Sequence, residues 1–302
     1  MTNGTARTRS GAWLWALAFL LMLGAGVYQR LTGPTHPLRG TFAAAGEEVG
    51  FRLARAARTD GPARIAVPDA PGVEGGEVVW RRFPTADEWT AVPLVREDGE
   101  WAARLPIQPA AGKLEYFVRL RVDGGEVRLP AAERGQAVLR YRDPVPATVL
   151  VPHVAFMFFG VLVAWRAGLG ALFRPRGLRR LAWWALGLFT IGGLVFGPIV
   201  QEAAFGEYWT GVPFGWDLTD NKTLVMWLAW LLAALALERI RRRGATPPGE
   251  PGLSGRGARA LVLVAAIVTV AVYLIPHSAR GSELDYEALD SGVPASEAIG
   301  TG

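Results

Sequence analysis

The chain contains no cysteine, and it has little histidine, lysine and methionine. Its 302 residues include three His and four Met, and Lys113 and Lys222 are its only lysines. Without thiols the protein forms no disulfide, no thiolate metal site and no cysteine-held iron–sulfur cluster. Disorder, collagen and coiled coil are excluded as well, because 51% of the residues are hydrophobic and they are clustered.

The hydrophobic residues are concentrated in five runs: Trp13–Tyr28, Thr148–Trp165, Leu181–Val200, Thr223–Leu237 and Ala260–Ile275. A helix that crosses a bilayer needs about 20 residues, so each run, with its flanking residues, predicts a transmembrane helix. The first run is predicted to be a retained signal anchor. Arg7 and Arg9 precede it, and no small-x-small cleavage site occurs before Tyr28.

The charges predict the orientation of these helices. Arginine is abundant before the first run, after the second and after the fourth, whereas residues 201–222 and the segment from His277 onward are acidic. By the positive-inside rule, the N-terminus lies in the cytoplasm, and residues 29–147, the 201–222 loop and the C-terminus lie outside an inner membrane. The net charge of +5 is therefore interpreted as an orientation signal, and we expect a lipid bilayer rather than nucleic acid as partner.

The segment between the first two runs has the pattern of a β domain. Residues 113–122 alternate between apolar and polar side chains, and Asp123-Gly124 supplies the positive φ angles of a hairpin turn. Further short strands occur over about 100 residues, which is typical of an immunoglobulin-like sandwich with Trp80 and Trp101 in its core. The predicted fold class is therefore an α-helical membrane protein with five transmembrane helices plus an all-β immunoglobulin-like sandwich inserted between helices 1 and 2.

Four parts of the chain follow from these patterns. They are a signal anchor (1–30), an extracytoplasmic sandwich (31–146), a four-helix transmembrane domain (147–280) whose outer loop (201–222) is aromatic, and an acidic tail (281–302). The tail is expected to be disordered after about Asp290, because it is polar and rich in small residues there.

One group of residues has the chemistry of a haem site. His153 and His277 each follow a proline at the predicted outer end of a helix, and an aromatic, glycine-rich loop lies between them. Two neutral imidazoles at one membrane depth are suited to axial ligation of haem iron, aromatic rings to covering a porphyrin, and acids to orienting the second ring nitrogen. The candidate cofactor-binding residues are His153, His277, Tyr208, Trp209, Trp216, Asp217 and Arg280, the last being suited to a haem propionate or to pairing with Glu283.

The same residues resemble those of a known family. Tyr208-Trp209 and Gly215-Trp216-Asp217 resemble the tryptophan-rich loop of the haem-handling membrane proteins of cytochrome c assembly, and Trp227-Leu228 resembles the start of the helix that follows this loop. The resemblance covers roughly residues 150–280. It implies haem binding or presentation, with His153 and His277 as metal ligands.

Structural roles remain open for each of these residues. The histidines are also suited to interfacial capping after proline, and His36 lies in a proline-rich linker where a structural role is expected. Asp217 and its acidic neighbour Asp220 are suited to capping the helix that begins there. Lys222 is expected to pair with an acid or to extend toward the membrane surface.

Two functions from different classes follow. The first is haem handling at the outer membrane surface, in cytochrome biogenesis or electron transfer. The second is a non-catalytic scaffold or assembly subunit that binds a protein partner through its β domain. A hydrolase or transferase acting through Asp217 or Glu202 is disfavoured because no nucleophile–base pair is evident, and a transporter is disfavoured because no midspan polar site is evident.

Overall fold

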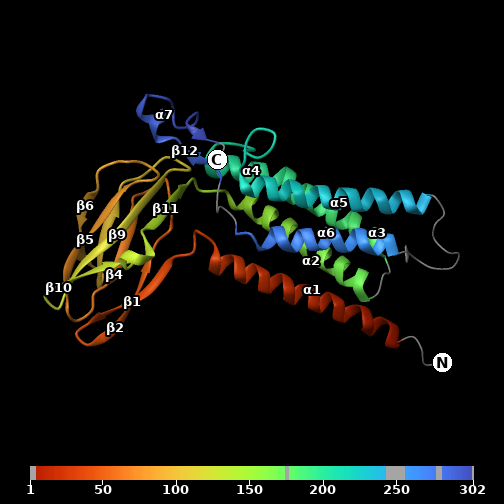
Figure 1. Ribbon diagram of the computed structural model, residues 1–302, viewed down its shortest axis with the longest axis horizontal. Coiled ribbons are helices and arrows are strands. Elements are labelled where there is room, and N and C mark those ends of the chain that lie inside the picture. The colour runs from red at the N-terminus through yellow and green to blue at the C-terminus, as the bar shows by residue number, and fades with distance from the viewer. Residues whose placement is uncertain (1–4, 174–176, 243–255, 277–280, 301–302) are drawn as a thin grey trace. The chain divides into compact units, whose positions relative to one another are not determined.

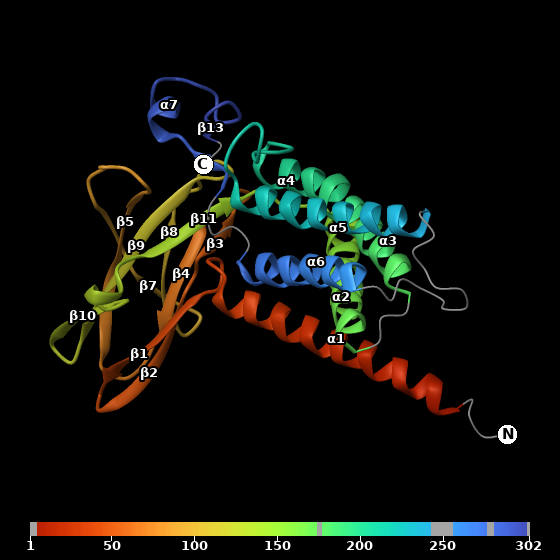
Figure 2. The same ribbon diagram turned by 45° about the vertical axis from the view of Figure 1, so that its right-hand side comes forward.

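The computed structural model describes residues 5–173, 177–242, 256–276 and 281–300, with side chains from residue 11 onward. The chain forms two compact units (Figures 1 and 2). A helical unit contains Met1–Gly33, Val145–Glu202 and Tyr208–Arg280, and a β unit contains Pro34–Pro144, Ala203–Glu207 and Gly281–Gly302.

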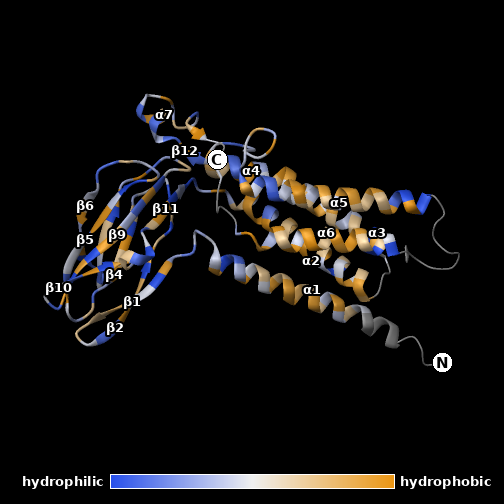
Figure 3. Ribbon diagram, viewed as in Figure 1, coloured by the Kyte–Doolittle hydropathy of each residue, from blue (hydrophilic) through white to orange (hydrophobic). Residues whose placement is uncertain are grey.

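Long apolar helices build the helical unit. They are α1 (Thr5–Thr32), α2 (Ala147–Phe173), α3 (Leu178–Phe189), the π-helical segment η2 (Thr190–Phe196), α4 (Gly197–Phe205), α5 (Leu218–Arg242) and α6 (Arg256–Leu274). The last three residues of α4 belong to the β unit. Among the described residues, five helical segments are long and apolar enough to cross a membrane when α3, η2 and α4 are taken as one. Figure 3 shows hydrophobic residues along these helices and hydrophilic residues at the arginine-rich end of α5.

Two tryptophan hydrogen bonds join these helices. α2 packs against α1, α3 and α6, and α5 packs against α3 and α6. The Nε1 of fully buried Trp230 on α5 donates to Thr269 Oγ1 on α6 at 2.8 Å. Trp227 Nε1 donates in the same way to Thr190 Oγ1 at 2.8 Å. Hydrogen bonds of this kind between helices help to fix their packing in an apolar environment.

The described part of the β unit contains four sheets. Its strands are β1 (Leu38–Ala44), β2 (Glu47–Leu53), β3 (Ala56–Arg58), β4 (Ala63–Pro68), β5 (Val73–Arg82), β6 (Thr90–Pro93), β7 (Val95–Glu97), β8 (Glu100–Leu105), β9 (Lys113–Val122), β10 (Gly125–Leu129), β11 (Ala137–Arg142), β12 (Glu283–Leu284) and β13 (Ile299–Gly300). The sheet orders are β1-β2, β3-β11-β9-β5-β6 with β10 also on β9, β4-β8-β7, and β12-β13. A short 3₁₀ helix, η1 (Ala132–Arg134), and the tail helix α7 (Tyr286–Asp290) complete the unit.

The predicted fold class, five transmembrane helices plus an inserted immunoglobulin-like sandwich, is wrong. An immunoglobulin-like sandwich consists of two antiparallel sheets, but here the strands are divided among four small sheets, and β3 pairs with β11 in parallel. The unit is also not a single insertion, because residues 203–207 and the tail belong to it. The third apolar run is not one continuous α-helix, because η2 interrupts it.

Local predictions within the β unit are confirmed. Residues 113–122 form β9, whose residues Leu114, Tyr116, Val118 and Leu120 are buried in the core. Asp123 and Gly124, with φ of 52° and 74°, turn the chain into β10. Trp80 and Trp101 pack against the same core.

The expected disorder after Asp290 is wrong within the described residues. The tail forms α7 and the β12–β13 pair, and Leu284, Tyr286 and Ala298 make a small core of their own. Asp285 caps α7, because its carboxylate accepts from the backbone N–H groups of Glu287 and Ala288. The tail is therefore a folded part of the β unit.

Candidate functional site

The loop between α4 and α5 is tied down by side chains at the start of α5. Asp217 Oδ1 accepts hydrogen bonds from the backbone N–H groups of Thr219 at 2.6 Å and Asp220 at 3.1 Å. This is the capping arrangement that the composition predicts, and it is confirmed. The carboxylate of Asp217, which was a candidate haem-site acid, therefore caps the N-terminus of α5.

Asp220 and Asn221 hold the middle of the loop. Asp220 Oδ2 accepts from Thr210 N, and Asn221 Oδ1 accepts from Val212 N, both at 2.7 Å. A Cβ added to Gly211 would lie 2.5 Å from Asp220 Cβ, so only glycine permits this close approach. The backbone of the loop is therefore held in place by polar side chains of the first turn of α5.

The outer side of the loop is aromatic and exposed. Tyr208, Phe214 and Trp216 are 59%, 72% and 76% exposed, respectively. Trp209 instead bonds within the loop, where its Nε1 donates to Val212 O at 3.1 Å. Of the candidate haem-covering residues, Tyr208 and Trp216 therefore extend away from the protein.

Lys222 links the start of α5 to the end of α6. It is buried, and its Nζ donates to the backbone oxygen of Ile275 at 2.8 Å. Its described hydrogen bond thus goes to a backbone carbonyl, rather than to the acids with which pairing was expected. Lys222 therefore fixes the helix ends around the loop.

His153 on α2 contacts the π-helical segment. Its Nδ1 lies 2.9 Å from Gly192 O, and because a carbonyl only accepts, Nδ1 is the donor of this hydrogen bond; in the neutral imidazole the lone pair is then on Nε2. A π-helix has different hydrogen-bond spacing from the flanking α-helix, and such segments often occur at functional sites. A Cβ added to Gly192 would lie 2.9 Å from Phe156 Cβ, so this glycine serves close helix packing.

The second candidate iron ligand, His277, lies outside the described residues, as does Arg280. Within the described ranges, no group of three or more His, Asp or Glu side chains is arranged to hold a metal ion. Of the candidate site residues, the structure therefore places Tyr208, Trp209, Trp216 and Asp217 in one loop and His153 on α2.

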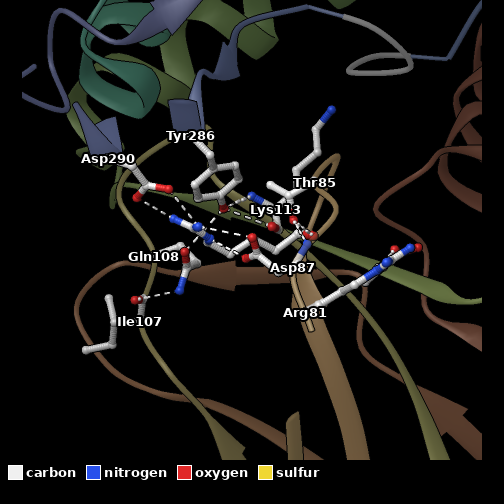
Figure 4. A network of polar contacts seen from close by, with 10 residues as sticks. Arg81, Thr85, Asp87, Ile107, Gln108, Lys113, Tyr286 and Asp290 are labelled. Atoms are coloured by element: carbon white, nitrogen blue, oxygen red, sulfur yellow. Dashed lines mark hydrogen bonds and ion pairs between the residues drawn. The ribbon is translucent and has the colours of Figure 1, made fainter. Parts of the chain in front are cut away.

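A second polar cluster, which the sequence interpretation missed, fastens the tail to the β strands (Figure 4). We call it the tail clasp; it consists of Arg82, Asp87, Gln108, Lys113, Glu283, Tyr286 and Asp290. Arg82 binds Asp87 through Nε at 2.5 Å and Asp290 through Nη1 at 2.7 Å, and Lys113 pairs with Glu283. The sequence signal for it was the acidic tail, which contains no basic residue after Arg280.

Tyr286 occupies the centre of the tail clasp. Its ring is buried, with the Arg82 guanidinium 4.9 Å above the ring centre. Its hydroxyl accepts from Lys113 N and lies within donating distance of Lys113 O, each at 2.9 Å, and of Gln108 Oε1 at 3.2 Å. Burial raises the pKa of Tyr286 to about 12.

Arg82 controls the ionisation of the two acids it binds. Its hydrogen bonds lower the pKa of Asp87 and the pKa of Asp290 below the ordinary aspartate value. Both carboxylates are therefore charged at neutral pH. In the tail clasp, the positive charge of Arg82 on β5 binds the negative charge of Asp290 in the tail.

No protein-family model, curated protein or solved structure matches this chain. The resemblance to haem-handling proteins of cytochrome c assembly therefore stays a prediction.

Proposed function

We propose that this protein is a non-catalytic docking subunit, anchored in an inner membrane, that binds a protein partner through its β unit. Five apolar helical segments support the membrane location. The charge distribution supports a cytoplasmic N-terminus and an extracytoplasmic β unit, because arginine is concentrated on alternate connections.

A cluster of aromatic and arginine side chains on and beside β5, β9 and β10 carries this proposal. We call it the docking patch; it consists of Arg81, Trp89, Phe117 and Arg128. The rings of Trp89 and Phe117 meet edge to face, with centres 5.4 Å apart. Arg81 lies 4.5 Å from the centre of the Trp89 ring, and Arg128 lies 4.3 Å from the centre of the Phe117 ring.

The docking patch has the composition of an interaction hot spot. Tryptophan and arginine are the residues that most often dominate the binding energy of protein interfaces, and stacking on the rings holds these guanidinium groups in place before a partner arrives. Trp89 is 37% exposed and is not part of the hydrophobic core of the β unit. The patch is therefore available for contact in the free protein.

Charges of both signs surround the docking patch. Arg81 pairs with Glu115 at 2.5 Å, and Arg119 pairs with Glu77 at 2.9 Å. Arg121 lies across the β9–β10 ladder from Glu126, whereas Arg128 forms no ion pair among the described residues. A carboxylate of the partner would bind Arg128 beside the aromatic pair.

Photo-crosslinking followed by binding measurements tests this proposal. A photoreactive amino acid is placed at position 89, and another at Val95, which is 61% exposed on a different sheet. We expect position 89 in intact membranes to capture one discrete protein that position 95 does not capture. Identical adducts from both positions would contradict the proposal.

Haem handling is the second candidate function, and His153 is the observation that favours it. A ligating histidine commonly donates from one ring nitrogen to a backbone carbonyl and binds metal through the other, which is the arrangement that His153 makes with Gly192. In this proposal Nε2 of His153 and a ring nitrogen of His277 would hold the iron, and haem would supply electron transfer.

Absorption spectra test this second candidate. Protein is purified in detergent from haem-supplied cells, oxidised and reduced, together with His153→Ala and His277→Ala. A Soret band with sharp reduced bands, lost in both variants and retained in His36→Ala, would support a bis-histidine haem site. Haemin binding that is the same in all four proteins would overturn it.

A further inference from the structure

The loop between α4 and α5 carries large apolar side chains that the protein leaves uncovered. Among the described residues, Trp216 and Phe214 are the two most exposed large hydrophobic side chains, and their neighbour Val212 is 41% exposed. Apolar side chains that are grouped in one exposed loop mark an interaction surface.

The backbone of this loop is fixed before any partner binds. Trp209 Nε1 donates to Val212 O at 3.1 Å, and the backbone N–H groups of Phe214 and Gly215 donate to Gly211 O at 2.9 and 3.0 Å. The chain therefore makes a tight turn that includes Phe214. Because the turn is already ordered, little conformational entropy is lost when its exposed side chains are buried against a partner.

One face of α5 is apolar and exposed. Four side chains at helical spacing form a stripe along it: Val225, Leu228, Leu232 and Leu235, which are 50%, 41%, 64% and 50% exposed. The opposite face packs into the helical unit through residues such as fully buried Trp230. Because α5 is long and apolar enough to cross a membrane, the stripe is the face that this helix presents to lipid.

Asn221 places the turn at the beginning of this stripe. Residues i and i+4 lie on one face of a helix, so Asn221 continues the stripe one turn before Val225. Asn221 Oδ1 accepts from Val212 N at 2.7 Å, which seats the turn on the same face. Lys222 lies on the buried side of α5, where its Nζ binds Ile275 O near the end of α6. The exposed turn is therefore continuous with the lipid-facing side of α5 rather than with its buried side.

The composition of the loop is suited to the headgroup level of a bilayer. The loop joins two segments that are long and apolar enough to cross a membrane, Leu178–Phe205 and Leu218–Arg242, and it therefore lies at the membrane surface. Tryptophan is enriched at this level, because its ring is apolar and its N–H can bond to polar lipid groups. Residues 206–217 contain two acids and no Lys or Arg, so the attraction is apolar and requires no anionic lipid.

We infer that Phe214 and Trp216 insert into the interfacial layer of the bilayer beside the first turn of α5. Their rings lie at the level of the glycerol and upper acyl groups, and the Trp216 N–H donates to lipid oxygens. The inserted loop fixes the depth at which α5 enters the membrane. The inference does not depend on the docking patch, and it gives these rings a lipid partner in place of a porphyrin.

Spin labelling of the full-length protein in phosphatidylcholine vesicles tests this inference. The chain has no cysteine, so a single-cysteine variant carries one label. The test label is attached in Phe214→Cys. Reference labels are attached in Leu232→Cys, on the lipid-facing stripe, and in Val95→Cys, which is 61% exposed on the β unit. Electron paramagnetic resonance then compares collisions with oxygen, which concentrates in the bilayer, and with a water-soluble nickel chelate.

The label at position 214 should collide more with oxygen than with the nickel chelate, at a depth of about 5–10 Å into the boundary between headgroups and acyl chains. The label at position 232 should lie deeper, and the label at position 95 should favour the nickel chelate. An oxygen-to-nickel ratio at position 214 equal to that at position 95 would overturn the inference, because the loop would then lie in water. Low collision rates with both reagents would also overturn it, because protein would then cover the loop.

Further arms separate lipid insertion from the alternatives and control for folding. Adding phosphatidylglycerol to the vesicles should leave the depth at position 214 unchanged; insertion only in its presence would contradict the apolar mechanism. Added haemin should also leave it unchanged, whereas loss of collisions with both reagents would place a porphyrin over the loop and overturn the inference. If Phe214→Cys fails to melt cooperatively in detergent, Trp216→Cys carries the label instead, with the same results expected and the same results overturning the inference.

Discussion

Replacing Tyr286 should release the tail from the β unit. The ring is 4% exposed, and truncation of a buried aromatic side chain to alanine typically costs about 3–5 kcal/mol. Tyr286→Phe keeps the ring but leaves the Lys113 N–H without its acceptor, at a cost of about 1–3 kcal/mol. Since the tail contributes only a small core of its own, these losses should appear as local opening rather than global unfolding.

Hydrogen exchange read by mass spectrometry measures this opening directly. Tyr286→Phe should speed exchange in residues 281–300 by about 5- to 150-fold, since each 1.4 kcal/mol is a factor of ten, and Tyr286→Ala should speed it further. Strand β5 and residues 114–122 of β9 should keep their wild-type protection, because their core does not include Tyr286. Glu287→Ala, at an exposed position of the same helix, is the control. Wild-type protection of the tail in Tyr286→Ala would refute the role assigned to the clasp.

Three further outcomes follow from the structure. Lowering the pH should loosen the tail: Arg82 lowers the pKa of Asp87 and the pKa of Asp290, so their stabilisation is complete above the unfolded value of about 4 and is lost as pH falls through the lower folded values. Tail exchange after acid pulses checks this, and protection that is unchanged down to about pH 2 would contradict it. Gly211→Ala should destabilise the helical unit by about 1–3 kcal/mol, because the added Cβ meets Asp220, whereas Gly187→Ala has open space and should not; Tm values in detergent compare the two. Thr269→Val should cost about 1 kcal/mol by removing the acceptor of Trp230 Nε1, and a Tm equal to wild type would contradict this role.

Features encoded over short stretches of sequence could be predicted. The β9–β10 hairpin follows from strict alternation and from a turn whose residues tolerate positive φ. The apolar helices follow from hydropathy and length, and the Asp217 cap follows from side-chain type at a helix start.

Features that depend on distant pairing could not be predicted. Residues 56–58 and 140–142 form the parallel β3–β11 pair, and nothing in either short segment specifies the other. The segment after about Asp290 was predicted to be disordered because it is polar and rich in small residues. Its few apolar residues, such as Val293 and Ala298, become packed only in the small core that they form with Leu284 and Tyr286.

The candidate site also combines features that could be predicted from the sequence with features that could not. Its residue types were evident, but the hydrogen bonds from Thr210 and Val212 to Asp220 and Asn221 are set by how the loop folds back onto α5. The contact of His153 with Gly192 depends on the packing of α2 against η2. The small side chain of Gly192 permits this close approach.

The most direct test of the docking proposal is the dissociation constant of the partner captured through position 89. It should be measured for full-length wild type, Trp89→Ala and Val95→Ala in detergent. We expect Trp89→Ala to weaken binding about 30-fold, the effect of losing a hot-spot residue worth about 2 kcal/mol, and Val95→Ala to bind as wild type. Equal dissociation constants for Trp89→Ala and wild type would contradict the assignment of the docking patch.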